Sequence, residues 1–287
     1  MWFRTDSETV AVRVSLTGPP SMDQMAGTGQ CGMDAYVGDW GAQRYWGTAR
    51  PVLGSAEYSA VLFRAVGRQD RTVCLNLPLY VGVRELQVGL DPDATVTAAP
   101  PFEHPGRVVI YGTSITHGGC ASRPGAAYPA LLSRRLRQEV LNLGFAGNSK
   151  GDAEVAHILG ELEDVACYVL DYETNVLEVE PLRETLTAFI PILREARPGV
   201  PILVVTKPAL ARGLRDPGYR ATTLERRDLQ REIVDRHRAA GDTDVHFLDL
   251  TDLDIAEATV DGVHPSDLGF VQLADAIEPS LRRLLGH

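Results

Sequence analysis

The sequence predicts an α/β protein in which an all-β domain precedes a domain of alternating strands and helices. About the first 100 residues contain short runs rich in Val and Leu and almost nothing helical. The proline-rich segment TAAPPFEHPG, residues 97–106, then stops that pattern, and strand and helix patterns alternate after it. We therefore place an all-β domain at residues 1–100, a linker at 101–106 and an α/β domain at 107–287.

Four runs in the first domain read as strands, and several of them alternate apolar with polar residues. Gly, Pro and Asp turn signals separate them, which is typical of an antiparallel sandwich, jelly roll or barrel-like domain. The runs are VAVRVSL (10–16), YSAVLFRAV (58–66), RTVCLNLPL (71–79) and GVRELQVGL (82–90).

The first domain is also rich in aromatic residues, notably Trp2, Trp40, Tyr45 and Trp46. These rings could pack in the core, or some could stack on a sugar face or line a cleft. We favour packing.

The second domain repeats a strand-then-helix rhythm. Five strands that alternate with helices imply a parallel sheet with helices on both faces. The expected strands are 108–111, 139–144, 165–172, 201–208 and 244–250, and the expected helices are 128–138, 152–162, 181–196, 221–240 and 266–285.

Composition excludes several classes of protein. The hydrophobic fraction of 44% and charged fraction of 23% are those of a globular chain, which excludes fibrous and disordered classes. The net charge of −10 argues against nucleic acid or an anionic membrane as the main partner. No signal peptide or membrane-spanning run is visible, so we expect a cytoplasmic location.

The four cysteines fit no zinc or redox spacing, and we expect free thiols at Cys31, Cys74, Cys120 and Cys167. His117 and Cys120 could share a metal ion, but no further ligands cluster with them. We expect no metal site and no cofactor.

Ser114 is the candidate nucleophile. It follows the apolar run of residues 108–111 and Gly112, so it lies at the carboxyl end of a buried strand. That edge of a parallel sheet is where ligands bind.

A serine hydroxyl needs a base to take its proton. His264 lies in TVDGVHPSDLG, after the last expected strand and before the last helix, at the same sheet edge as Ser114. The remaining six histidines have ordinary explanations in loops, helices, a strand start and the chain end: His104, His117, His157, His237, His246 and His287.

Asp261 lies three residues before His264, and Gly262 permits a tight turn between them. Such a carboxylate would fix the imidazole tautomer and stabilise the imidazolium. The alternative is that Asp261 and Ser266 only shape the turn and cap the last helix.

Acyl transfer also needs hydrogen-bond donors for the oxyanion. Gly147 follows the second strand and Asn175 the third, and the amide of Ser114 would be a third donor. Taken singly, Gly147 could be a loop glycine and Asn175 a turn or cap residue.

Four blocks together resemble the SGNH hydrolases, also called GDSL-type esterases, from Arg107 to the end of the chain. They are GTSIT (112–116), Gly147, Asn175 and DGVH (261–264). The resemblance implies a flavodoxin-like three-layer α/β/α domain, a triad of Ser114, His264 and Asp261, and an oxyanion hole of Ser114, Gly147 and Asn175.

The sequence departs from the family pattern at two places. Threonine replaces the usual aspartate at Thr113, and DYETN (171–175) replaces the more familiar Gly-x-Asn-Asp. Competing motifs do not fit, since GTSIT lacks the final glycine of a Gly-x-Ser-x-Gly elbow and no lysine follows it as in a P-loop.

The run GTSITHGGCASRPGAAYP is similar to a branch of bacterial acetylxylan and carbohydrate esterases in which an all-β domain can precede the hydrolase domain. The resemblance implies a serine esterase that removes a short acyl group, most simply acetyl, from a sugar or a glycosylated small molecule. The alternatives are a thioesterase or acyltransferase with the same triad, and an inactive carbohydrate-binding protein.

Four residues are candidate substrate contacts: Tyr128, Tyr172, Glu173 and Lys207. Lys207 could instead form a salt bridge. The expected partner is a small-molecule or carbohydrate ester, with no nucleic acid or membrane, and the related esterases make a homo-oligomer plausible.

Overall fold

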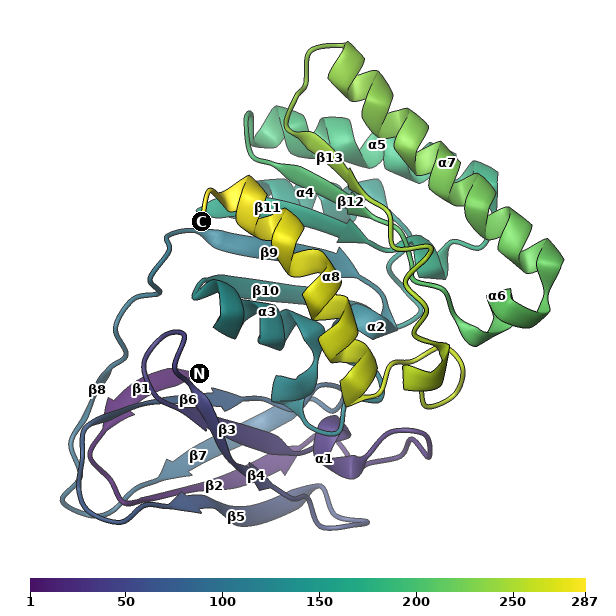
Figure 1. Ribbon diagram of the computed structural model, residues 1–287. Coiled ribbons are helices and arrows are strands. Elements are labelled where there is room, and N and C mark those ends of the chain that lie inside the picture. The colour runs from purple at the N-terminus through teal and green to yellow at the C-terminus, as the bar shows by residue number, and fades with distance from the viewer. The chain divides into compact units, whose positions relative to one another are not determined.

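The computed structural model describes all residues 1–287 and divides them into two compact units (Figure 1). The first unit consists of Met1–His104 and Gly118–Arg137, and the second of Pro105–His117 and Gln138–His287. Each unit is described by itself. Each helix is either too short or too polar to span a lipid bilayer.

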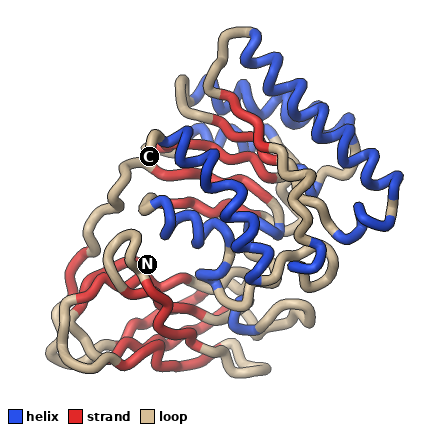
Figure 2. The backbone as a smooth tube through the Cα atoms, in the orientation of Figure 1, coloured by secondary structure: helices blue, strands red, loops and turns tan.

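The first unit is built mainly from two antiparallel sheets, whose strands are red in Figure 2. The five-stranded sheet has the order β4-β3-β6-β1-β8, from β1 (Trp2–Thr5), β3 (Met33–Val37), β4 (Arg44–Ala49), β6 (Arg71–Asn76) and β8 (Val96–Ala98). The three-stranded sheet has the order β5-β2-β7, from β2 (Thr9–Leu16), β5 (Glu57–Arg64) and β7 (Val83–Gly89). The predicted all-β fold of this region is confirmed.

Alternation along β2 shows why the two sheets pack face to face. Val10, Val12 and Val14 are buried while the residues between them are half-buried or exposed, as the two-residue period of a strand requires. These valines share one core with Met33 and Ala35 of the other sheet. The first unit is therefore a sandwich.

Four strands of this unit were not predicted: β1, β3, β4 and β8. The strand β3, MDAYV, is buried along its whole length although its second residue, Asp34, is an acid. An aspartate normally marks a turn, so the period-two pattern gave no sign of a strand there.

Asp34 of β3 is completely buried and fixes the later segment of residues 118–137 within this unit. Its Oδ1 accepts a hydrogen bond from Asn76 Nδ2 at 2.7 Å, and its Oδ2 accepts one from the Gly125 amide at 2.8 Å. Gly125 lies in η1 (Pro124–Ala126), just before α3 (Tyr128–Leu136). Burial raises the pKa of Asp34, and these two hydrogen bonds oppose the rise.

Tyr36, two residues along β3, contacts two arginines of the same segment. Arg123 donates to its hydroxyl at 2.8 Å, and the Arg134 guanidinium lies 3.9 Å from the centre of its ring. The first contact is a hydrogen bond, and the second is a cation–π contact, which gains strength from partial burial. Residues 118–137 therefore belong by packing to the β unit, although the sequence places them after Ser114.

Most of the aromatic residues noted in the sequence pack against other rings of this unit. Trp40 stacks on Phe102 with centroids 4.2 Å apart and lies 4.4 Å from Trp2. Trp46 meets Phe63 edge to face at 4.8 Å. These contacts agree with the packing interpretation.

The second unit contains one parallel sheet with the order β10-β9-β11-β12-β13. In chain order this is 2-1-3-4-5, the flavodoxin-like arrangement, and its topological switch point lies at the first strand, between its two neighbours. The strands are β9 (Arg107–Gly112), β10 (Glu139–Gly144), β11 (Val165–Asp171), β12 (Ile202–Val205) and β13 (Val245–Leu248). The predicted parallel α/β fold is confirmed.

Helices cover both faces of this sheet (Figure 1). The helices α4 (Ala153–Glu161), α5 (Val179–Ala196) and α7 (Pro217–Ala239) share a core with one face of the strands, and α8 (Asp267–Leu285) crosses the other face. Shorter elements are α1 (Gly27–Gln30) in the first unit and α2 (Ser114–His117), η2 (Glu173–Asn175), α6 (Ala211–Arg215) and η3 (Ala256–Ala258) in the second.

The helix α7 begins at Pro217, four residues before the predicted start at Ala221. Asp216 is its N-cap, and the Asp216 carboxylate accepts a hydrogen bond from the Tyr219 amide at 3.0 Å. Proline is favoured in the first turn of a helix, where its missing amide hydrogen costs nothing. The Pro-Gly pair therefore belongs to the helix.

Candidate active site

Ser114 lies two residues after the end of the buried strand β9, which has a neighbour on each side in the sheet, and is the first residue of α2. The turn depends on Gly112, because a Cβ there would lie only 2.7 Å from the Cβ of Thr116 and would overlap its hydroxyl. A strand packed on both sides thus delivers the serine to the carboxyl edge of the sheet.

Both neighbouring strands hold this turn in place. Thr116 Oγ1 donates to Asp171 Oδ2 of β11 at 2.9 Å, and Asn142 Nδ2 of β10 donates to the Thr116 carbonyl at 2.8 Å. The Phe145 amide also donates to the Gly112 carbonyl at 2.9 Å. The backbone around Ser114 is therefore fixed by partners that are themselves part of the sheet.

His264 meets Ser114 across 150 residues of sequence, with 2.9 Å between His264 Nε2 and Ser114 Oγ. The imidazole is carried by the loop between η3 and α8. That loop is closed by a hydrogen bond of 2.8 Å from the Val260 amide to the His264 carbonyl. The sequence prediction that these two residues share one sheet edge agrees with this geometry.

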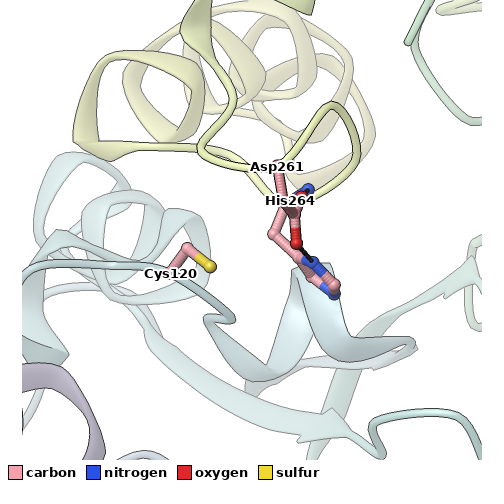
Figure 3. A group of neighbouring side chains, drawn as sticks. All are labelled: Cys120, Asp261 and His264. Carbon is pink, nitrogen blue, oxygen red and sulfur yellow. Dashed lines mark hydrogen bonds and ion pairs between the residues drawn. The ribbon is translucent and has the colours of Figure 1, made fainter. Parts of the chain in front are cut away.

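Asp261 lies on the other side of the imidazole, with 2.7 Å between its Oδ2 and His264 Nδ1 (Figure 3). Its Oδ1 accepts the amides of Val263 at 3.0 Å and His264 at 2.8 Å. Gly262 makes this turn possible with a φ of +85°, which is strained for any residue with a Cβ. Cys120, also drawn in Figure 3, belongs to the first unit.

The hydrogen bonds to Asp261 decide its ionisation. Partial burial raises the pKa of its carboxyl, but the bonds from the His264 backbone and ring and from the Val263 amide outweigh burial and lower it. An ionised Asp261 can accept a hydrogen bond from His264 Nδ1, and in that tautomer Nε2 can accept one from the Ser114 hydroxyl.

Asn175 ends the short turn η2 beyond β11. Its Nδ2 atom is enclosed by protein and makes no hydrogen bond, a rare condition for a buried amide nitrogen. Such a donor is suited to an acceptor that is present only during a reaction.

Gly147 lies in the turn after β10, with a φ of +72°. A Cβ built on it would meet nothing within 4 Å, so its backbone conformation alone explains the glycine. The strand order places β10 and β11 on either side of β9, so Gly147, Ser114 and Asn175 follow three adjacent strands.

Comparison with known proteins decides the family. The model of the GDSL-like lipase/acylhydrolase family matches residues 106–282. The chain belongs to this family. A second model, GxDLY, which describes the N-terminus of SGNH hydrolase-type esterases, matches residues 1–96. The expected resemblance is confirmed, and this GDSL-like protein is a serine hydrolase that acts on ester bonds.

Solved structures resemble the GDSL-like chain over both units. A GDSL-like lipase from Bacteroides ovatus ATCC 8483 is 28% identical, with a TM-score of 0.90 over 99% of this chain and 84% of that one. The salicylyl-acyltransferase SsfX3 from a tetracycline biosynthetic pathway is 22% identical, with a TM-score of 0.78 over 99% and 81%.

A family two carbohydrate esterase from Clostridium thermocellum, solved with cellohexaose, is 15% identical, with a TM-score of 0.71 over 99% of this chain and 92% of that one. Relatives of such low identity share the fold. No curated protein matches the chain.

The GxDLY name fits three residues whose roles are visible in the first unit. They are Gly32, Asp34 and Tyr36, with Ala35 in place of the leucine. A Cβ on Gly32 would lie 2.8 Å from the Ala49 carbonyl oxygen, and Asp34 and Tyr36 hold residues 118–137 as described above. The residues of this motif therefore stabilise the packing of the β unit. The sequence analysis did not assign this role to them.

The four candidate substrate contacts of the GDSL-like enzyme are all buried in their units. Tyr128 begins α3 in the first unit. In the second unit, the Tyr172 hydroxyl lies 3.2 Å from Thr185 Oγ1, and Lys207 Nζ donates to the Tyr219 hydroxyl at 2.7 Å. Glu173 pairs with Arg226. Their roles as substrate contacts stay predictions.

The sequence analysis did not single out two polar residues that bind residues of the predicted site region. The Asp171 carboxylate accepts a hydrogen bond from the Thr116 hydroxyl, and Arg226, which lies on α7, donates one to Glu173. Asp171 could have been found as a second polar residue at the end of β11, beside Asn175. Arg226 gave no signal, since an arginine in a charged amphipathic helix reads as exposed.

Proposed function

We propose that this GDSL-like enzyme removes a short acyl group, most simply acetyl, from a sugar or a glycosylated small molecule. The observation that carries the proposal is the continuous series of hydrogen bonds from Ser114 through His264 to Asp261, at 2.9 and 2.7 Å. This is the arrangement that activates a serine for nucleophilic attack.

In the proposed reaction, Ser114 Oγ attacks the ester carbonyl while its proton moves to His264 Nε2. The oxyanion that forms would accept hydrogen bonds from Asn175 Nδ2 and from the amides of Ser114 and Gly147. The intermediate then expels the alcohol, which takes the proton from His264 and leaves an acyl-serine.

Water completes the proposed cycle. His264 takes a proton from water, the resulting hydroxide attacks the acyl carbonyl, and the carboxylic acid leaves as Ser114 recovers its proton. Asp261 stays ionised throughout and balances the charge of the imidazolium. All proton transfers in this cycle use the imidazole of His264, which is hydrogen-bonded to both Ser114 and Asp261.

The nature of the substrate is supported by relatives that share the fold of both units. Two are described as a family two carbohydrate esterase and as an acetyl xylan esterase, Est2A, from Butyrivibrio proteoclasticus. A shared fold does not fix the substrate, so this part of the proposal rests on analogy.

A series of aryl esters from acetate to decanoate, together with acetylated sugars, tests the proposal. We expect the highest kcat/KM with acetate and release of acetate from sugar esters. Ser114→Ala should abolish hydrolysis, whereas Ser59→Ala, at an exposed serine of β5, should not change it. Retained activity in Ser114→Ala would reject the proposal.

Acyl transfer to an alcohol is the second candidate, because the fold matches a salicylyl-acyltransferase over 99% of the chain. Added alcohol acceptors would then divert the acyl group from water, and the product ratio measures the diversion. Thioester donors belong in the same assay.

An inactive binding protein would fail to label with a fluorophosphonate at Ser114 while still folded.

A further inference from the structure

A buried ion pair lies directly beside the turn that carries Asn175. The carboxylate of Glu173 and the guanidinium of Arg226 are each 1% exposed, with 3.1 Å between Glu173 Oε1 and Arg226 Nε. Glu173 begins η2, and Arg226 comes from the middle of α7.

The pair is completed by further hydrogen bonds. Glu173 Oε2 accepts the Lys207 amide at 3.0 Å and Gln230 Nε2 at 2.9 Å. Arg226 Nη1 donates to the carbonyl of Leu177. Glu173 is thereby tied both to the end of β12 and to α7.

These contacts bracket Asn175 in the chain. Arg226 holds the side chain of Glu173, two residues before it, and the carbonyl of Leu177, two residues after it. The turn itself is one short 3₁₀ segment, in which the Asn175 amide donates to the Tyr172 carbonyl at 3.0 Å. So short a segment has little stability of its own, and the arginine supplies fixed points on both sides.

A buried ion pair is a poor source of stability, because desolvation of both charges offsets their attraction. An apolar pair of similar volume would often serve stability as well. The pair does fix geometry, because its directional hydrogen bonds determine where the turn η2 lies relative to α7 and β12.

Asn175 needs such support from outside its own side chain. Its Nδ2 makes no hydrogen bond, so no contact of this nitrogen fixes the rotation of the amide. A donor in an oxyanion hole is effective only when it is held in place before the charge develops.

We propose that Glu173 and Arg226 are positioning residues that hold the Asn175 amide toward the oxyanion, with Gln230 as their support. This inference rests on the proposed function, in which Asn175 stabilises the oxyanion. It also accounts for the glutamate in DYETN, the block in which this chain departs from the usual Gly-x-Asn-Asp.

The test is a double-mutant cycle on aryl acetate hydrolysis, with wild type, Asn175→Ala, the charge-free pair Glu173→Leu/Arg226→Met, and all three changes together. We expect the charge-free pair to lower kcat about 100-fold while KM changes less than about threefold. In the Asn175→Ala background the same pair should lower kcat by no more than about twofold, since the donor it positions is gone.

The pair Arg194→Met/Asp242→Leu is the matched control. It removes a partly buried ion pair of 2.8 Å before β13, at the amino end of the sheet. It should leave kcat unchanged, and thermal unfolding shows whether each variant is folded. If the charge-free pair does not fold, Gln230→Met replaces it in the test, because this variant keeps both charges. We expect Gln230→Met to lower kcat as well.

Each outcome separates the two proposals. An equal loss of kcat in both backgrounds, or no loss in a folded charge-free variant, overturns the positioning role alone. No loss of kcat in Asn175→Ala overturns the positioning role together with the oxyanion role of Asn175. Hydrolysis by Ser114→Ala overturns the proposed function itself.

Discussion

Asp261 holds both the ring and the backbone of His264. One carboxylate oxygen lies 2.7 Å from His264 Nδ1, and the other accepts the His264 amide at 2.8 Å. The backbone bond fixes where the residue lies and the ring bond fixes which nitrogen carries the proton. A change at Asp261 should therefore affect catalysis more than binding.

Asp261→Asn should lower kcat for aryl acetates by about 10³- to 10⁴-fold, with a much smaller change in KM. The amide can keep the turn by accepting backbone hydrogens, but it favours the imidazole tautomer with its proton on Nε2, which cannot accept from Ser114. Steady-state kinetics measure the effect. Asp254→Asn, which changes a neighbouring loop aspartate that caps the Ala256 amide, should stay within about twofold of wild type.

Asn175→Ala should separate activity from stability. We expect kcat to fall about 10²- to 10³-fold, whereas the free energy of unfolding should change by less than about 0.5 kcal/mol or increase, because a buried amide nitrogen without a partner is lost. Urea denaturation and kinetics on the same samples measure both quantities.

Asn142→Ala is the matched comparison for that prediction. The Asn142 side chain donates to the Thr116 carbonyl at 2.8 Å and accepts the Gly144 amide at 3.0 Å, so its loss should cost about 1–3 kcal/mol of stability. Equal destabilisation in the two variants would show that Asn175 is an ordinary structural amide.

Gly112→Ala should destabilise the enzyme by about 1–3 kcal/mol and reduce activity, because the new methyl group would overlap Thr116 in the turn that carries Ser114. Thermal and urea unfolding measure the cost. Gly213→Ala in α6, where a Cβ meets nothing within 4 Å, should be neutral or stabilising by up to about 1 kcal/mol. If Gly112→Ala were as stable as Gly213→Ala, the turn would be looser than described.

Lys207 should make stability depend on pH. Burial lowers its pKa, and the hydrogen bond to Tyr219 only partly opposes this. Between this lowered value and about 10.4, the unfolded chain binds more protons at this site than the folded chain, so the free energy of unfolding rises with pH. The free energy of wild type minus that of Lys207→Met should therefore increase from pH 7 to 9.5.

Lys150→Met, at the exposed second lysine, controls for the loss of one positive charge in that experiment. Urea denaturation at each pH gives the three free energies. A difference between wild type and Lys207→Met that stays constant with pH would mean that Lys207 keeps its charge in the folded state.

The parallel sheet could be predicted because each of its strands is a short apolar run between longer helical patterns. In β9, the four residues 108–111 are fully buried, and such a run carries a strong signal in sequence. The strand β3 carried a weak one, since its buried Asp34 depends on Asn76 and Gly125, which lie far away in the chain.

The grouping of Ser114, His264 and Asp261 could be predicted from strand ends, because parallel strands bring their carboxyl ends to one edge. Their catalytic roles stay a prediction. The surroundings of Glu173 could not be predicted in this way. A carboxylate at a strand end resembles a ligand contact, and its partner Arg226 lies 53 residues later on a helix that looked solvent-exposed.

Residues 118–137 belong to the first unit although they follow Ser114, and this affects how the protein is made. On the ribosome, the β unit cannot complete its packing until residue 137 has emerged. Asp34 needs the Gly125 amide as a hydrogen-bond donor, and Tyr36 needs its contacts with Arg123 and Arg134. The strand β9, which precedes Ser114, is therefore synthesised before the first unit is complete. Each unit consists of two separate segments of the chain, so neither unit can be expressed as one continuous piece of the gene. Exchanging one unit between relatives therefore requires more than one junction in the gene.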